Sequence, residues 1–168
     1  HNFGSISGKA LRDSLPAVRV RDTGRYRKRA NDFVINWGNA TLPTWGASDL
    51  NKEEAVARAS DKITALQVMK NAGVRTVEFT EDSDIVEQWI SEGFSVYART
   101  LTRASSGRGI RIIGTNDIIP DAKLYTKGIV GDEYRVHVFD GVVIDYTKKI
   151  PLEGSNLKPE ESQIKSNT

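Results

Sequence analysis

The 168-residue chain has no cysteine, and it has only two histidines and one methionine. The lack of cysteine excludes a disulfide framework and thiolate metal sites. No apolar run approaches the roughly 18 residues that a membrane-spanning helix needs, and no secretory hydrophobic segment is present. We therefore expect a cytoplasmic protein with no membrane partner. The net charge of +2 is too small to indicate a nucleic-acid partner by itself.

The hydrophobic fraction of 38% and the charged fraction of 27% are ordinary for a globular protein, so the chain could hold one domain or two small ones. The sequence begins with His1 rather than methionine, as if in the middle of a strand. It stops at Thr168 with no helix or strand to complete. We therefore expect the sequence to be incomplete at both ends.

The first 45 residues predict a small open α/β domain. A glycine-serine loop at residues 4–8 precedes a short helix through Lys9–Leu11, and it forms either a plain turn or an anion site of backbone N–H groups. Residues 33–39 predict a buried strand that runs into a loop. Asn36 and Asn39 at the end of this strand either face a ligand, as at the edge of an open sheet, or cap the loop.

Residues 19–29 form a strongly basic run, with six cations against one acid, Asp22. The cations are Arg19, Arg21, Arg25, Arg27, Lys28 and Arg29. Such a run is typical of a solvated surface. Contact with an acidic protein or with nucleic acid is the alternative, because basic clusters attract polyanions whatever their sequence. No RNP-like, helix-turn-helix or zinc signature supports a dedicated nucleic-acid fold.

Residues 41–50 are predicted to form a linker, and the pattern beyond them is α+β. Asn51 is expected to cap a helical stretch with Glu53 and Glu54 in its first turn, which stops at Gly73. The further predicted elements are strands over 74–79, 94–100 and 110–114, and a helix from Asp82 or Ser83 to Gly93. In the strand 94–100, Val96 and Ala98 are expected on one side and Tyr97 and Arg99 on the other.

Two loops in the second half have compositions that suit nucleotide binding. Residues 102–109 hold serines, glycines and arginines, which suit a lid over a polyphosphate; an ordinary mobile hairpin is the alternative. Three strands are then predicted in close succession between Leu124 and Lys149. The second strand alternates like a half-buried strand and enters a tight turn at Asp140-Gly141. Glu133 lies among cations there, an arrangement suited to gripping a nucleotide.

Taken in order, these segments resemble the ATP-grasp superfamily, and most closely its branch that ligates glutamate to ribosomal proteins. The likeness covers about residues 51–168. The matching segments are Asp61-Lys62 opening a helix, the turn Ala72-Gly73-Val74, the flap Ser105–Ile110, the adenine hinge and ribose-binding acid within Lys127–Arg135, the basic pair Lys148-Lys149, and Lys165-Ser166-Asn167.

The resemblance implies an ATP-grasp nucleotide-binding region over residues 46–168, after an N-terminal domain over residues 1–45. Backbone groups of the hinge would bind the adenine edge, which leaves the Lys127 side chain free to touch adenine or phosphate, and Glu133 would accept from the ribose. The residues implied to bind ATP are Lys62, Arg99, Ser105, Ser106, Gly107, Gly109, Lys127, Gly128, Ile129, Glu133 and Asn167. Arg135, Lys148 and Lys149 are implied to be catalytic.

The implied function is an ADP-forming, ATP-dependent carboxylate–amine ligase that works through an acyl phosphate. Such chemistry needs cations around a lidded pocket rather than a protein nucleophile, and His137 is expected to be a strand histidine rather than a catalytic base. ATP and magnesium are the implied cofactors. The family's metal ligands follow the segment at which this chain stops, so we expect them beyond residue 168 and none within the chain.

The carboxylate and amine substrates stay open, and a peptide or protein is among the candidates. One alternative is a non-catalytic nucleotide- or partner-binding module of the same fold that uses the basic run 19–29. Another is an unrelated α+β domain whose hinge-like hairpin is a coincidence.

Overall fold

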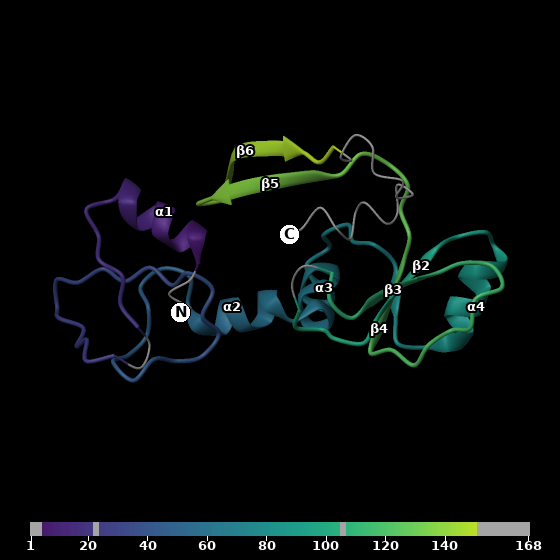
Figure 1. Cartoon of the computed structure of the whole chain (residues 1–168), viewed down its shortest axis with the longest axis horizontal. Helices are drawn as coiled ribbons and strands as arrows, with labels where there is room; N and C mark the ends of the chain where they lie inside the picture. Colours follow the sequence, from purple (N-terminus) through teal and green to yellow (C-terminus); the bar gives the residue numbers. More distant parts are fainter. Residues whose placement is uncertain (1–4, 22–23, 105–106, 151–168) are drawn as a thin grey trace. The chain divides into compact units, whose positions relative to one another are not determined.

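The computed structural model describes residues 5–21, 24–104 and 107–150, and it divides the chain into two units, His1–Ala65 and Leu66–Thr168. Helices and antiparallel sheets occur together in the described ranges (Figure 1). The expected mixture of helices and strands is confirmed, and the antiparallel pairing of both sheets makes the class α+β. No helix in the described part of the chain is both long and apolar enough to cross a bilayer.

The first unit begins with α1 (Ile6–Ser14), which is the short helix expected there. Ser5 is its N-cap, and the Ser5 hydroxyl accepts a hydrogen bond of 3.1 Å from the Gly8 N–H. This bond satisfies one of the N–H groups that a helix start leaves open. The glycine-serine segment therefore supplies a helix cap from Ser5.

The strand predicted at residues 33–39 is wrong. Phe33 is 70% exposed, and Ile35 forms only an isolated parallel bridge with Leu50, so no sheet forms among the described residues of this unit. The segment bonds to residues 49–50 instead: the Asn36 N–H donates to the Leu50 carbonyl at 3.0 Å, and the Asp49 carboxylate accepts from the Val34 N–H at 2.7 Å. The amide of buried Asn36 caps the loop in the same way, so the loop-capping alternative for this residue is confirmed.

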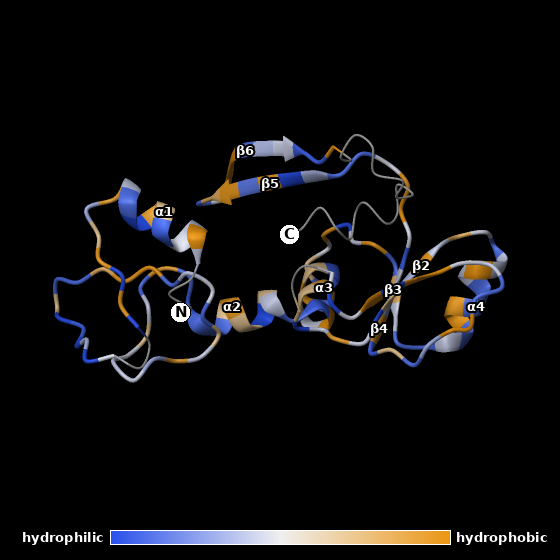
Figure 2. Cartoon of the chain, viewed as in Figure 1, coloured by the Kyte–Doolittle hydropathy of each residue, from blue (hydrophilic) through white to orange (hydrophobic). Residues whose placement is uncertain are grey.

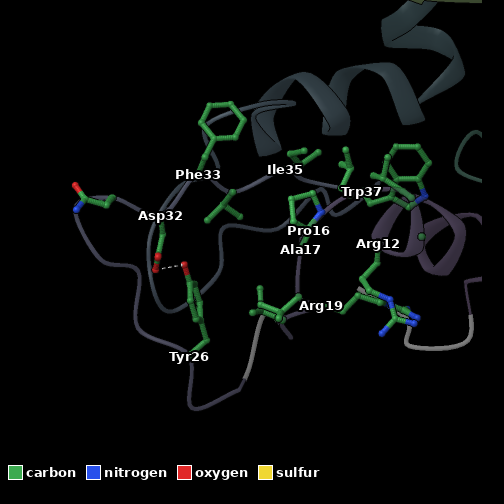
Figure 3. A pocket seen from close by; sticks show the side chains of 16 residues that line it. Arg12, Pro16, Ala17, Arg19, Tyr26, Asp32, Phe33, Ile35 and Trp37 are labelled. Carbon is green, nitrogen blue, oxygen red and sulfur yellow. Dashed lines mark hydrogen bonds between the residues drawn. The ribbon is translucent and has the colours of Figure 1, made fainter.

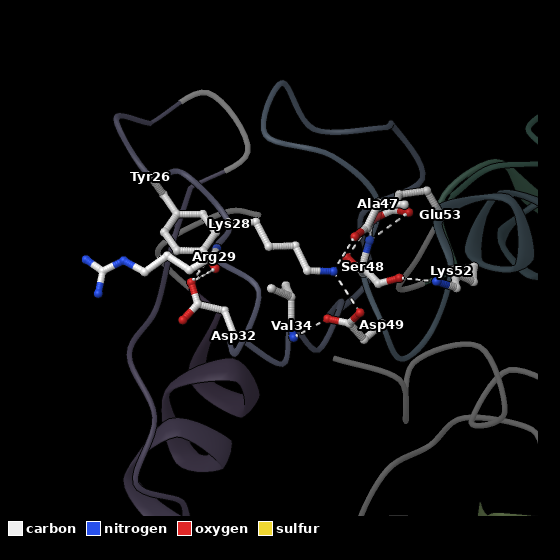
Figure 4. Close-up of polar contacts among 10 residues, drawn as sticks. All are labelled: Tyr26, Lys28, Arg29, Asp32, Val34, Ala47, Ser48, Asp49, Lys52 and Glu53. Carbon is white, nitrogen blue, oxygen red and sulfur yellow. Dashed lines mark hydrogen bonds and ion pairs between the residues drawn. The ribbon is translucent and has the colours of Figure 1, made fainter.

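Residues 41–50 belong to the first unit and do not form a linker (Figure 4). The Lys28 ammonium lies 2.7 Å from the Asp49 carboxylate, and the Ser48 hydroxyl donates to the Glu53 carboxylate at 2.6 Å. These contacts fix the start of α2 (Glu53–Ser60), whose N-cap is Lys52. Asn51 was the wrong cap: it has a φ of 56° and its amide donates to the Asn36 carbonyl.

Two further helices end in the same glycine motif. α3 (Lys62–Asn71) begins at the predicted Asp61-Lys62 step, and α4 (Ser83–Ser91) is capped by Asp82 as expected. Gly73 and Gly93 follow the two helices with φ values of 74° and 89°. In each case the N–H after the glycine donates five residues back, which is the Schellman arrangement. Both predicted stops are confirmed.

The second unit contains a four-stranded antiparallel sheet in the order β1-β4-β2-β3. Its strands are β1 (Phe79–Thr80), β2 (Val96–Arg99), β3 (Ile110–Ile113) and β4 (Leu124–Lys127). The first strand is much shorter than the predicted 74–79. Val86 and Trp89 of α4 pack on this sheet, and the sheet's own share of that core comes from Val96, Ala98, Ile113 and Tyr125.

A separate hairpin joins β5 (Tyr134–Phe139) to β6 (Val142–Lys148). The turn residues Asp140 and Gly141 have φ values of 49° and 76°, so the predicted tight turn is confirmed. The predicted half-burial is wrong, since every residue of both strands is exposed, including the apolar residues near the turn (Figure 2). β4 pairs with β1 and β2, so the three successive strands do not form one sheet.

Candidate functional site

The four-stranded sheet has two faces of different character. Val96 and Ala98 are buried in the core with α4, and the alternation of a strand directs Tyr97 and Arg99 to the opposite face. This division of β2 was predicted from the sequence and is confirmed. Arg99, the predicted phosphate ligand, therefore lies on the face away from α4, at the end of β2 that leads into the flap.

Arg99 is a half-buried cation whose side chain has no hydrogen-bond or ion-pair partner among the described residues. Burial lowers the pKa of its guanidinium, which nevertheless stays charged at any physiological pH. Taking a charge out of water is costly unless an opposite charge or hydrogen bonds compensate. The position is therefore suited to an anion from outside the chain.

The flap that follows Arg99 is closed at its base by backbone hydrogen bonds. The Thr100 N–H donates to the Gly109 carbonyl at 2.9 Å, and the Ile110 N–H donates to the Gly107 carbonyl at 3.2 Å. Gly107 and Gly109 have φ values of 70° and 72°, and a β-carbon at Gly109 would come within 2.9 Å of the Thr100 hydroxyl. Both glycines are thus required by the backbone. Ser105 and Ser106, also predicted as ligands, lie outside the described residues.

Lys127, at the end of β4, is held by protein groups. Its ammonium lies 3.4 Å from the Glu78 carboxylate, 3.5 Å from the Glu92 carboxylate and 3.9 Å from the centre of the Phe94 ring. Only 15% of the side chain is exposed. The expectation that this side chain is free to touch adenine or phosphate is therefore wrong, because two carboxylates and an aromatic ring already surround it.

The backbone of the predicted hinge leaves one N–H group open. The Lys127 N–H donates to the Glu78 carbonyl at 3.0 Å, and the Gly128 N–H donates to the Ser95 carbonyl at 2.7 Å. The N–H of exposed Ile129 donates to no described residue. These three residues line a cavity of about 520 Å³ together with Phe94 and the segment 75–78.

The hairpin brings two of the three predicted catalytic cations next to acids. The Lys149 ammonium pairs with the Glu133 carboxylate, and the Lys149 N–H donates to the Glu133 carbonyl at 2.8 Å. The Lys148 ammonium lies 2.7 Å from Asp132, and this hydrogen bond raises the pKa of Lys148. Glu133 therefore does lie among cations.

Arg135, the third predicted catalytic residue, lies on β5, where its register partner is Thr147. His137 also lies on β5, opposite Asp145, so the predicted strand position of this histidine is confirmed. Arg135 and His137 alternate with Tyr134 and Val136 and therefore share the other face of the ribbon.

Two further nucleotide ligands were predicted, Lys62 and Asn167. Lys62 is the first residue of α3 and belongs to the first unit, whereas Arg99 belongs to the second. The Asp61 carboxylate before it accepts from the Thr64 N–H at 3.2 Å, which explains the helix start at this step. Asn167 lies outside the described residues. No group of three metal-binding side chains is found in the ranges that the structure describes.

Sequence reasoning missed the three residues that hold Lys127, which are Glu78, Glu92 and Phe94. Glu78 precedes β1, Glu92 is the C-cap of α4, and Phe94 follows that cap by two residues. A contact between segments this far apart leaves no local pattern. The helix stop at Gly93, which was predicted, is the one signal that could have placed Glu92 and Phe94 near a turn.

The sequence matches no model of a known protein family, and neither the curated proteins nor the solved structures contain a match. We therefore infer a function from the residues of the site alone.

Proposed function

We propose that the chain binds ATP at the four-stranded sheet, with the phosphates at Arg99 and the adenine at the hinge Lys127–Ile129, as part of an ATP-dependent carboxylate–amine ligase of the ATP-grasp type. The observation that carries this proposal is Arg99 itself. It is a half-buried guanidinium without a hydrogen-bond or ion-pair partner in the described ranges, at the end of β2 that leads into the glycine-containing flap. A phosphate group would supply the missing negative charge and accept from the planar guanidinium with two parallel hydrogen bonds.

The hinge supports the adenine part of the proposal. The open Ile129 N–H is a donor for a ring nitrogen, and the neighbouring cavity of about 520 Å³ falls within the range of roughly 300–1,000 Å³ that is usual for small-ligand pockets. Phe94 lines the same cavity and offers an aromatic surface. The contacts of the Lys127 side chain with Glu78, Glu92 and Phe94 would fix the backbone conformation at Gly128, so that the Ile129 N–H stays in place.

In the proposed reaction a carboxylate oxygen attacks the γ-phosphorus of ATP and ADP leaves, which gives an acyl phosphate. An amine then attacks the acyl carbon, and inorganic phosphate leaves as the amide forms. Developing negative charge is best stabilised by fixed cations in such transfers. We assign this role to Arg135, Lys148 and Lys149. Magnesium normally shares this role, but the described residues do not form a site that fits it, and we assign it no ligand.

A second candidate function is nucleotide binding without catalysis. It is favoured by one observation, which is that both lysines of the basic pair are already neutralised. Lys148 pairs with Asp132, and Lys149 pairs with Glu133. In this case the basic run 19–29 of the first unit would bind an acidic partner. Arg21, Arg25, Arg27 and Arg29 of this run are exposed.

The binding step is tested by calorimetric titration with ATP, ADP and adenosine. Loss of hydrogen bonds to a charged group costs about 1.5–3 kcal/mol, so Arg99→Met should weaken ATP binding roughly 10- to 150-fold and leave adenosine binding nearly unchanged. Arg111→Met is the matched control, since Arg111 is an exposed arginine on neighbouring β3, opposite Ala98 in register. No ATP binding by the unchanged chain would overturn the proposal, as would equal losses for ATP and adenosine.

Catalysis is tested separately with hydroxylamine as the amine. An acyl phosphate formed from an amino acid or peptide is trapped as a hydroxamate, and ADP appears in equal amount. We expect ATP-dependent hydroxamate with at least one carboxylate of a mixed pool, and loss of the product in Arg135→Met. ATP binding with no hydroxamate and no ADP would favour the non-catalytic module.

A further inference from the structure

The first unit contains a cleft that plays no part in the proposed nucleotide site. Its volume is about 370 Å³, and it lies among α1, the segment 15–20 and the segment 31–37 (Figure 3). Most of the residues that line it are apolar, and Trp37, Ile35, Leu15 and Val18 are among them. A concave, mainly apolar site with a few polar groups is the usual form of a small-molecule pocket.

Hydrogen bonds fix the walls of this cleft. The Trp37 indole N–H donates to the Ser7 hydroxyl of α1 at 3.1 Å. The Tyr26 hydroxyl donates to the Asp32 carboxylate at 2.8 Å, and the same carboxylate accepts from the Arg29 N–H at 3.0 Å. Asp32 is the acid that lines the cleft, and its charge is already engaged by these two donors. It therefore does not act as an open negative group toward a ligand.

Arg12 supplies an unused donor. Its Nε atom is buried and has no hydrogen-bond partner, and no other buried side-chain nitrogen or oxygen in the described ranges is in this state. One terminal nitrogen of the same guanidinium pairs with Asp13 at 2.5 Å, while Nε stays unpaired. An unsatisfied buried donor is costly and calls for an acceptor. In Figure 3, Arg12 and the Tyr26–Asp32 pair lie at opposite ends of the cleft.

We propose that this cleft binds a small carboxylate with an apolar body, such as an arylalkanoic acid. The carboxylate accepts from the unpaired Nε–H of Arg12, and the body packs on Trp37, Ile35 and Leu15. Arg19 also lines the cleft and adds positive charge. The apolar lining disfavours a bare inorganic anion, and the arginine disfavours a neutral hydrocarbon. The inference uses residues of the first unit alone and stands independently of the proposed ATP site.

The probe is 3-phenylpropanoate, titrated into the whole chain by calorimetry and by the fluorescence of Trp37. We expect saturable binding that is at least about tenfold tighter than that of 3-phenylpropanol, which lacks the charge, and of acetate or inorganic phosphate, which lack the body. Absence of binding would overturn the proposal. Equal affinity for the alcohol would show an apolar pocket only, and equal affinity for phosphate would show an anion site only; either result overturns it.

Variants separate the two parts of the site. Arg12→Met should weaken the binding of 3-phenylpropanoate at least about tenfold, since a charged hydrogen bond is lost. Arg27→Met, in the exposed basic run, is the control and should leave this binding unchanged. Leu15→Trp, at an exposed lining position, fills the cleft without removing charge and should abolish binding. If Arg12→Met fails to fold, Leu15→Trp alone decides, and unchanged affinity in this variant would place the ligand elsewhere.

Discussion

The Ser95 carbonyl oxygen accepts a hydrogen bond of 2.7 Å from the Gly128 N–H, and a β-carbon added at Gly128 would lie only 2.6 Å from this same oxygen. Glycine is thus needed here for close approach of two backbones rather than for a positive φ. The contact fixes the chain directly after β4, where the adenine hinge is proposed.

Gly128→Ala should therefore destabilise the second unit. Relief of the clash requires a backbone shift, so we expect a loss of roughly 1–3 kcal/mol in the free energy of unfolding, measured by urea denaturation followed by circular dichroism. Gly114→Ala is the matched control, because its added β-carbon would meet nothing nearer than 3.9 Å. A cost at Gly128 no larger than at Gly114 would contradict the close approach.

Lys127→Met should destabilise the same unit through loss of charge rather than of packing. Methionine keeps most of the apolar stem, while Glu78 and Glu92 lose their cation and Phe94 loses its cation–π contact. Pairs of this kind contribute about 1–2 kcal/mol together. The urea experiment is repeated in a Glu92→Gln background, where Lys127→Met should cost less. Equal costs in both backgrounds would show that the pair with Glu92 contributes nothing.

Ser48→Ala should reduce both the stability of the first unit and its dependence on acid pH. Burial raises the pKa of Glu53, but hydrogen bonds from the Ser48 hydroxyl and N–H outweigh it, so the pKa lies below its ordinary value of 4.5. The stabilisation is therefore present above pH 4.5 and is lost as the pH falls through the lowered pKa. We expect a loss of about 1–3 kcal/mol at pH 7.

Urea unfolding of the Ser48 variant is followed by tryptophan fluorescence, to which Trp37 and Trp45 of the first unit contribute together with Trp89 of the second. The difference from the unchanged chain should shrink as the pH is lowered below 4.5. Ser14→Ala serves as control, since its exposed hydroxyl only bonds back to the Ala10 carbonyl. A difference that stays constant down to pH 3 would mean that Glu53 keeps its ordinary pKa.

Tyr26 should titrate late when the pH of the folded chain is raised. Burial, and then the hydrogen bond to Asp32, raise the pKa of Tyr26 from 10.0 to about 12. This group stabilises the folded state below pH 10 and loses the effect as the pH rises to about 12. Absorbance at 295 nm should show the late step in the folded chain, and Asp32→Asn should move it toward 10. A single step near pH 10 for all tyrosines would refute the Tyr26–Asp32 contact.

Local structure was predictable from the sequence wherever a short-range rule decides it. Gly73 and Gly93 end helices because glycine readily takes the left-handed conformation required there. Asp82 caps α4 because its side chain accepts from the Asp84 N–H in the first turn. Asp140 and Gly141 form their turn because both residue types tolerate the positive φ values that a tight hairpin turn requires. Arg99 was placed correctly on the far face of β2 because alternation in a strand has a fixed period.

The failures share a different cause. Residues 33–37 look apolar enough for a buried strand, but Asp49 satisfies the Val34 N–H, and a distant side chain cannot be seen in a local pattern. The alternation of β5 is real, yet exposure depends on whether another layer covers the ribbon, and no described segment does so. Lys127 was treated as an open cation because its partners Glu78 and Glu92 meet it only in three dimensions.

The Glu133–Lys149 pair lies at the open end of the hairpin. If Glu133 accepts from the ribose hydroxyls, Glu133→Ala should weaken ATP binding by about 1.5–3 kcal/mol. The binding of 2′,3′-dideoxy-ATP, which lacks these hydroxyls, should be unaffected. Lys149→Met breaks the same ion pair but keeps the carboxylate, so it should preserve the preference for ATP over the dideoxy nucleotide. Calorimetric titration of both variants with both nucleotides decides the matter. If the two variants lose affinity equally for both nucleotides, the pair only holds the ends of the hairpin together, and the ribose contact is wrong.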